Sequence, residues 1–127
     1  MHPIRILIAD DAKNVRHSLR LLMDNEADVV VVGEAADGIE AVEKVVELQP
    51  DLVLMDAQMP RLDGIQATRL LKEAFPRVKV IVLTVYADRL LEALLAGASH
   101  YLLKGCSREE LIEKIRETVA VREAPFN

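Results

Sequence analysis

Residues 51–64 read DLVLMDAQMPRLDG, and this stretch decides how the rest of the chain is interpreted. Four apolar residues, 52–55, run directly into Asp56. An apolar run of this kind is expected to be buried, whereas a carboxylate normally lies in water or against a partner. The stretch therefore indicates a buried strand that ends at an acid with a special environment.

Short aliphatic runs alternate with longer amphipathic runs on both sides of this stretch. The expected strands are residues 4–9, 29–33, 52–55, 79–84 and 101–103. Helices are expected at about 14–24, 39–47, 64–75 and 88–97, and a last helix opens at the capping box of residues 107–110. Strict alternation of this kind indicates an α/β protein, with a parallel sheet that helices cover on both faces.

The charge balance argues against nucleic-acid binding by this chain itself. Its 127 residues include 16 Lys and Arg against 21 Asp and Glu, a net charge of −5. The basic residues are scattered, so we expect no basic face that holds a phosphate backbone. A chain of this length suits one domain.

Cysteine usage and hydropathy indicate the cytoplasm. Cys106 is the single cysteine, which excludes an internal disulfide and a zinc finger. No apolar run reaches membrane-spanning length, and an acid arrives as early as Asp10. We therefore expect a soluble cytoplasmic protein with no membrane association.

Chemically active side chains follow four of the five expected strands. Asp10 and Asp11 follow the first strand, Asp56 the third, Thr84 the fourth and Lys104 the fifth. In an open α/β sheet, ligands bind outside the carboxyl ends of the strands. These side chains converge there if the first and third strands are neighbours.

Three carboxylates at one edge repel one another, and a divalent cation offsets that repulsion. Mg²⁺ typically takes one or two carboxylates together with waters and a phosphate oxygen. Pro60 disfavours helical geometry at Met59, so the loop after Asp56 stays extended and the Gln58 carbonyl can turn inward as another ligand. The sequence thus predicts a Mg²⁺ site.

Lys104 and Thr84 add the groups that a phosphoryl transfer needs. The lysine can pair with a carboxylate or with an incoming phosphoryl oxygen, and the hydroxyl can donate to a second oxygen. With positive charge around it, Asp56 can act as the nucleophile that forms an aspartyl phosphate.

The chain resembles the receiver domain of bacterial two-component response regulators along nearly its whole length. The matching signatures are ADD (9–11), DLVLMDAQMPRLDG (51–64), VIVLT (80–84) and GASHYLLK (97–104). GEAADGIEAV (33–42) and AGASHYLLKG (96–105) are most similar to receivers of LuxR/NarL-type transcriptional regulators. The resemblance implies a flavodoxin-like (βα)5 three-layer sandwich, with a five-stranded parallel sheet of order 2-1-3-4-5.

The resemblance also implies a role for each acid. Asp56 is similar to the aspartate that a histidine kinase phosphorylates. Asp11 resembles the direct Mg²⁺ ligand, and Asp10 the acid that holds metal-bound water. Asp56 completes the carboxylate ligands, and Gln58 contributes its backbone carbonyl.

The remaining implied roles belong to the switch. Thr84 resembles the hydroxyl residue that moves toward the phosphoryl group, and Tyr101 the aromatic that swings inward with it. Lys104 resembles the lysine that contacts the phosphoryl group. Many receivers carry a proline after this lysine, with a cis bond between them; here the next residue is Gly105, so a cis bond is not assumed.

The resemblance further implies a phosphorylation-dependent signalling switch rather than an enzyme, one that controls an output partner or domain and, through it, transcription. Its partners are a sensor histidine kinase, a C-terminal helix-turn-helix output domain absent from this chain, and a second copy on phosphorylation. We expect the receiver domain to occupy residues 1–122 and a linker or tail to begin at 123–127.

Other interpretations stay open for several of these residues. Asp10 and Asp11 could be solvated loop acids or a helix N-cap, and Tyr101 a plain half-buried aromatic. A phosphatase acting through an aspartyl phosphate commonly needs a second acid two residues after its nucleophile, where this chain has Gln58. Flavin binding is disfavoured because the loop after the first strand presents two acids to the flavin phosphate.

Two surface features are also expected. On the first helix, Arg16 and Arg20 flank His17 and indicate an exposed face without a chemical role for the histidine. The leucines of the expected fourth helix are expected to be mostly core, but they form a wider band than one buried stripe needs, so part of the band is expected to be a partner or dimer surface: Leu90, Leu91, Leu94 and Leu95.

Overall fold

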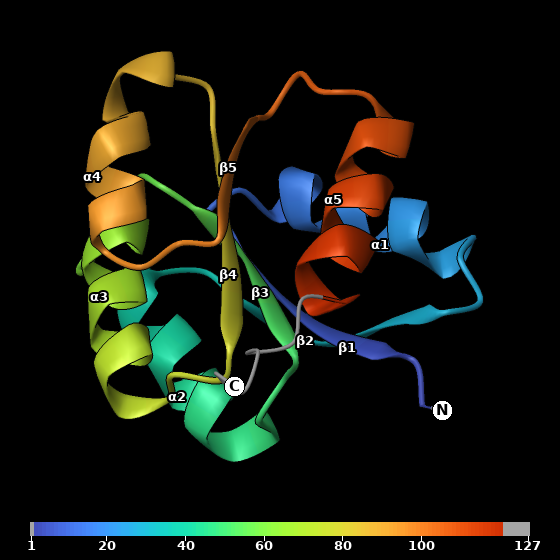
Figure 1. Ribbon diagram of the computed structural model, residues 1–127, viewed down its shortest axis with the longest axis horizontal. Helices are drawn as coiled ribbons and strands as arrows, with labels where there is room; N and C mark the ends of the chain where they lie inside the picture. Colours follow the sequence, from blue (N-terminus) through green and yellow to red (C-terminus); the bar gives the residue numbers. More distant parts are fainter. Residues whose placement is uncertain (1, 121–127) are drawn as a thin grey trace, which may run out of the picture.

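Five parallel strands run through the middle of the computed structural model, which describes residues 2–120 (Figure 1). The strands are β1 Ile4–Ala9, β2 Val29–Ala35, β3 Leu52–Asp56, β4 Lys79–Thr84 and β5 His100–Leu103. Their order in the sheet is β2-β1-β3-β4-β5. This confirms the order that the family resemblance implies, and it makes β1 and β3 direct neighbours.

Helices cover both faces of the sheet and complete the three layers. They are α1 Lys13–Asp24, α2 Gly38–Leu48, α3 Gly64–Ala74, α4 Leu90–Leu95 and α5 Arg108–Ala120, with a short 3-10 turn, η1 Ala87–Arg89, before α4. Helices α1 and α5 lie on one face, and α2, α3 and α4 lie on the other (Figure 1). The predicted α/β architecture is confirmed.

The central strands are buried on both faces because their side chains alternate between two cores. In β1, Ile6 and Ile8 pack toward α1 and α5, whereas Leu7 and Ala9 pack toward α2, α3 and α4. All five residues of β3 are buried. Burial on both faces explains why these strands read as continuous aliphatic runs.

The fourth helix is shorter than the expected range of 88–97. Residues 87–89 form η1, and α4 has six residues, of which Ala93 alone is buried. Its leucines are exposed, with exposed fractions between 44% and 75%. The expectation that these leucines are mostly core is therefore wrong. Gly97, at φ +107°, ends the segment as predicted.

Side-chain caps fix where the helices begin. Asp63 and Gln66 form a capping box at the start of α3, which the sequence interpretation missed. At α5, the Glu110 amide donates to the Ser107 hydroxyl at 3.1 Å, which confirms that half of the predicted box.

A cluster that we call the α5 clamp joins α5 to the α1–β2 loop. It consists of Glu26, Asp28, Arg108 and Arg116. Arg116 donates to both acids, at 2.6 Å to Glu26 and 2.7 Å to Asp28, and Arg108 lies 2.8 Å from Glu26. Two acids and two arginines thus balance one another at the surface.

Two expectations concern the termini and membranes. The expected domain boundary at residue 122 and the linker at 123–127 lie outside the described residues, so they stay predictions. Within residues 2–120, no helix combines the length and the apolar character that crossing a bilayer requires.

Candidate functional site

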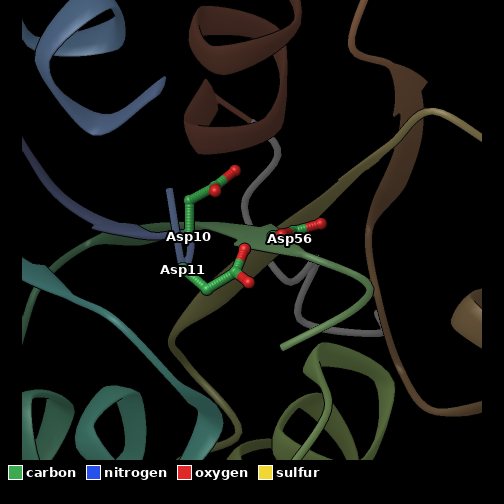
Figure 2. Close-up of side chains that lie close together, drawn as sticks. All are labelled: Asp10, Asp11 and Asp56. Atoms are coloured by element: carbon green, nitrogen blue, oxygen red, sulfur yellow. The ribbon is translucent and has the colours of Figure 1, made fainter. Parts of the chain in front are cut away.

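The carboxyl edge of the sheet brings the three predicted acids together. Asp10 and Asp11 follow β1, and Asp56 ends β3; the two strands pair directly, with Ala9 opposite Met55. One carboxylate oxygen of each acid lies within 4.8 Å of the others (Figure 2). The predicted convergence is therefore confirmed.

The three acids differ in their exposure to solvent. Asp10 is 2% exposed and Asp56 is 7% exposed, whereas Asp11 is open to solvent. The Ala12 amide donates to Asp10 Oδ1 at 2.9 Å, and the Gln58 amide donates to Asp56 Oδ1 at 3.3 Å. Backbone donors thus stabilise both buried carboxylates but leave their charge uncompensated.

Lys104 supplies the cation at this edge. Its Nζ lies 2.7 Å from Asp10 Oδ2 and 3.4 Å from Asp56 Oδ1. The lysine arrives from the residue after β5, as predicted, and its side chain is 23% exposed. We call Asp10, Asp11, Asp56 and Lys104 the acidic site; it sets three carboxylates against one ammonium group.

This imbalance perturbs the ionisation of the site. Burial and the neighbouring Asp10 charge together outweigh the opposing effect of Lys104 and raise the pKa of the Asp56 carboxyl to about 6. Burial lowers the pKa of Lys104, but its hydrogen bond to Asp10 and the charge of Asp56 outweigh that effect and leave the pKa above its ordinary value. The lysine is therefore charged, and one cation is shared between two buried acids.

Thr84 ends β4 next to the acidic site and is 1% exposed. Its hydroxyl oxygen accepts a hydrogen bond from the Tyr86 amide at 3.2 Å. An open pocket of about 500 Å³ is lined by Asp11, Asp56, Gln58, Met59, Pro60, Thr84, Val85 and Lys104. The carboxylate of Asp56, the hydroxyl of Thr84 and the ammonium of Lys104 thus line the same pocket.

Tyr101, in β5, connects to the same loop from the other side. Its hydroxyl donates to the Tyr86 carbonyl, while the Tyr86 amide donates to Thr84. The backbone of Tyr86 therefore links the ends of β4 and β5. Tyr86 thus contacts both Thr84 and Tyr101, the two residues of the predicted switch.

One prediction and one open question concern the loops. Gln58 lies in the pocket lining, as predicted, but its carbonyl as a metal ligand stays a prediction. The peptide bond between Lys104 and Gly105 is trans, since residues 2–120 contain no cis peptide bond.

The donor set fits a hard divalent cation. Its candidate ligands are carboxylate oxygens, which Mg²⁺ prefers, and they come close enough together to share one ion. The single ammonium of Lys104 leaves an excess of negative charge that an added cation would offset. The residues present therefore suit Mg²⁺.

Gly64 lets the start of α3 pack directly under the end of β3. Its amide donates to the Ala57 carbonyl at 2.9 Å. A Cβ built on Gly64 would overlap the backbone carbonyl of Asp56. Glycine is therefore required here for close approach of two backbones rather than for an unusual φ.

Sequence reasoning missed a residue that contacts the site from α1. Arg16 was expected on an exposed face with His17, and His17 is indeed exposed. The Arg16 side chain, however, is 15% exposed, and its Nη1 donates to the Asp10 carbonyl at 2.7 Å. The expectation is wrong for Arg16 because the side chain folds back over the β1–α1 loop and reaches Glu34 in β2. An acid at the end of the strand beside β1 was the signal available in the sequence.

Comparison with known proteins identifies close relatives of the chain. The family described as response regulator receiver domain matches residues 6–116. A transcriptional regulatory protein of Bacillus subtilis, YhcZ, is 47% identical over 112 residues, which are 87% of this chain and 52% of the relative. The response regulator protein VraR of Staphylococcus saprophyticus is 40% identical over 118 residues, which are 91% of this chain and 56% of VraR. The chain thus spans about half the length of these curated relatives.

Solved structures agree with this assignment. A LuxR-family two-component response regulator from Aurantimonas sp. SI85-9A1 superposes with a TM-score of 0.89 at 34% identity. The match covers 93% of this chain and 86% of that structure. The similarity to LuxR-type receivers that the sequence motifs indicate is therefore confirmed.

Proposed function

The chain belongs to the response regulator receiver domain family, and from this we propose that it is a phosphorylation-dependent signalling switch whose phosphoacceptor is Asp56. A sensor histidine kinase is the phosphoryl donor. One observation carries the proposal: Asp56 is a buried carboxylate at a strand end, 3.4 Å from Lys104, and it lines the same pocket as Thr84.

The transfer requires a carboxylate nucleophile. A carboxylate oxygen of Asp56 attacks phosphorus, the bond from phosphorus to the donor imidazole nitrogen breaks, and that nitrogen keeps the electron pair. Because the pKa of Asp56 is about 6, the carboxyl is mostly ionised at neutral pH despite its burial.

The acids and the lysine have complementary tasks in this step. Asp10, Asp11, Asp56 and the Gln58 carbonyl would hold Mg²⁺, and the bound ion supplies positive charge against the phosphoryl oxygens. Lys104 offsets the remaining charge from the opposite strand end and orients one phosphoryl oxygen. The transferred group thereby enters a site whose positive charges are already in place.

Phosphorylation then reaches the surface through Thr84. The Thr84 hydroxyl turns from the Tyr86 amide to a phosphoryl oxygen, which frees the backbone of Tyr86 to move. Tyr101 follows because its hydroxyl is bonded to the Tyr86 carbonyl. The phosphoryl charge is thus converted into a change of the loop that leads into η1 and α4.

The exposed apolar side chains beside this loop provide the output face. They are Val85, Tyr86, Leu90, Leu91, Leu94, Leu95 and Leu103. We propose that this face packs on an output domain or, on phosphorylation, on a second copy. The relatives' greater length supports a C-terminal helix-turn-helix output domain that controls transcription. The receiver itself carries a net charge of −5 and is therefore not expected to bind DNA. We place it in the cytoplasm because its phosphoryl donor, a sensor histidine kinase, acts there.

We place the chain among signalling domains and not among phosphatases. Hydrolytic turnover through an aspartyl phosphate needs an acid for the leaving group, and the pocket offers the amide Gln58 at the matching position. Many turnovers per molecule on a simple phosphate ester would contradict this assignment.

The test is covalent labelling with acetyl phosphate and Mg²⁺. We expect wild type to gain one phosphoryl group by intact mass, labile to hydroxylamine, and Asp56→Asn to gain none. Asp88→Asn, which changes an exposed acid in η1, serves as the matched control and should label like wild type. Equal labelling of Asp56→Asn and wild type would overturn the phosphoacceptor assignment.

A further inference from the structure

Arg16 joins α1 to the loop that carries two of the three acids. Its Nη1 donates to the backbone carbonyl of Asp10 at 2.7 Å, and its Nε donates to Glu34 Oε1 at 3.0 Å. The guanidinium is mostly buried, since the side chain is 15% exposed. A planar guanidinium that donates to two fixed acceptors has only one orientation available. Arg16 therefore connects the Asp10 carbonyl rigidly to Glu34.

The carbonyl that Arg16 holds belongs to the peptide group between Asp10 and Asp11. Because a peptide group is planar, fixing its oxygen also fixes the direction in which the chain leaves toward Asp11. Asp10 has further anchors: its amide donates to the Ala35 carbonyl at 3.0 Å, and its carboxylate accepts from Ala12 and Lys104. Within residues 2–120, no hydrogen bond restrains the exposed Asp11 carboxylate, so its position depends on this peptide.

Glu34 holds Arg16 in turn. The carboxylate lies in β2 opposite Ile8 of β1, and it accepts from Arg16 at Oε1 and from Arg20 at Oε2, at 3.0 and 2.9 Å. Burial raises the pKa of Glu34, but the hydrogen bonds from Arg20 and Arg16 outweigh it and leave the pKa below its ordinary value. Glu34 is therefore ionised at neutral pH, and it neutralises one of the two guanidinium charges.

We propose that Arg16 is a positioning residue for the metal site, which holds the peptide between Asp10 and Asp11 so that the Asp11 carboxylate meets Mg²⁺, and that Glu34 orients Arg16 for this task. The inference rests on the Mg²⁺ site of the proposed function and deepens it. Outer contacts of this kind orient metal ligands that cannot orient themselves.

Arg20 provides a matched control on the same helix. Arg16→Gln and Arg20→Gln each remove one guanidinium from Glu34 and change the net charge equally, but Arg16→Gln alone removes the bond to the Asp10 carbonyl. The measurement is Mg²⁺ binding to the unphosphorylated protein by isothermal titration calorimetry. We expect Arg16→Gln to weaken binding by about tenfold or more, and Arg20→Gln to stay near wild type.

Two more variants separate positioning from a loss of fold or charge. Arg16→Lys keeps the charge, but its single ammonium cannot reproduce the planar fork, so we expect only partial recovery of Mg²⁺ affinity. Glu34→Gln should weaken Mg²⁺ binding less than Arg16→Gln, and the double variant should be no weaker than Arg16→Gln because both act through one contact. Metal-free thermal unfolding of each variant checks that it is folded.

The Mg²⁺ affinities of these variants decide between positioning and a simple charge effect. Equal weakening by Arg16→Gln and Arg20→Gln, or full recovery by Arg16→Lys, would overturn the inference in favour of a simple charge effect. Wild-type affinity in Arg16→Gln would also overturn it, while phosphoryl labelling at Asp56 would leave the proposed function standing. Absence of Mg²⁺ binding to wild type would overturn the metal site and this inference together.

Discussion

The acidic site and the α5 clamp are both clusters of opposite charges, but they are constructed differently. The α5 clamp sets two carboxylates against two guanidinium groups at the surface, and its arginines lower the pKa of both Glu26 and Asp28. The acidic site sets three carboxylates against one ammonium group and buries two of the acids, and burial raises the pKa of Asp56 to about 6. One cluster is balanced and exposed, and the other is unbalanced and buried.

The difference separates charges that join two elements from charges that we propose take part in phosphoryl transfer. A balanced surface cluster adds little to the free energy of unfolding, but it also carries no penalty for burying unpaired charge. Buried acids that outnumber their cation work against folding, because burial penalises the charged form. The acidic site therefore lowers the stability of the fold locally, and an added cation would partly offset that loss.

Removing Lys104 should produce the largest change in stability. Lys104→Met leaves two buried acids without their shared cation, so we expect the free energy of unfolding to fall by about 2–4 kcal/mol at neutral pH without metal. Urea denaturation measures it. Lys114→Met, which removes an exposed lysine paired with Glu117, is the control and should change much less. If both variants lost the same free energy of unfolding, burial would not account for the larger effect expected at Lys104.

Asp56→Asn should stabilise the metal-free protein at neutral pH. The pKa of Asp56 in the folded chain, about 6, exceeds its ordinary value of 3.8, so the folded state binds the proton more tightly than the unfolded state does. The stability that this proton provides is present below about pH 4 and is lost as pH rises through about 6. Asparagine has no such loss, so we expect a gain of about 2 kcal/mol above pH 6, with an upper bound of about 3 kcal/mol at about 1.36 kcal/mol per pKa unit.

Urea denaturation in EDTA across this pH range tests the sign. The difference between Asp56→Asn and wild type should shrink as the pH falls through about 6 and vanish well below the ordinary pKa of 3.8, where the wild-type carboxyl is protonated in both states. A stability gain that is independent of pH would show that packing, and not charge, accounts for the effect.

Breaking the α5 clamp should have the smallest effect. Arg116→Gln removes a guanidinium that contacts Glu26 and Asp28, but water can replace it because Arg116 and Asp28 are about half exposed and Glu26 is partly exposed. We expect a slight loss of stability that disappears at about 1 M salt, where the Debye length is about 3 Å. Thermal unfolding at low and high salt measures it, with Arg77→Gln as the charge-matched control. A loss that matches that of Lys104→Met would mean that the clamp is essential for folding.

Much of the acidic site could be predicted from strand ends alone. The aliphatic runs locate the strands, and parallel strands bring their carboxyl ends to one edge, which places Asp10, Asp56 and Lys104 together. The neighbour relation of β1 and β3 came from the family resemblance, because periodicity identifies strands without ordering them.

The contacts of Arg16 could not be predicted in the same way. Whether a helical arginine points to solvent or over a loop depends on the rotation of α1 against the sheet, and its partner Glu34 is 18 residues away in β2. Hydrophobic spacing sets the buried face of a helix but not the path of a long polar side chain at its border. The leucines of α4 misled for a related reason, since apolar character alone does not distinguish a buried face from a docking face.

The backbone contact between Gly64 and Asp56 restricts which substitutions the segment from β3 to the first turn of α3 can accept. A saturation library at position 64 should return glycine alone, although that residue has no chemical group to contribute. For the same reason, a designer who transplants Asp56 into another scaffold must move β3, its loop and the first turn of α3 together.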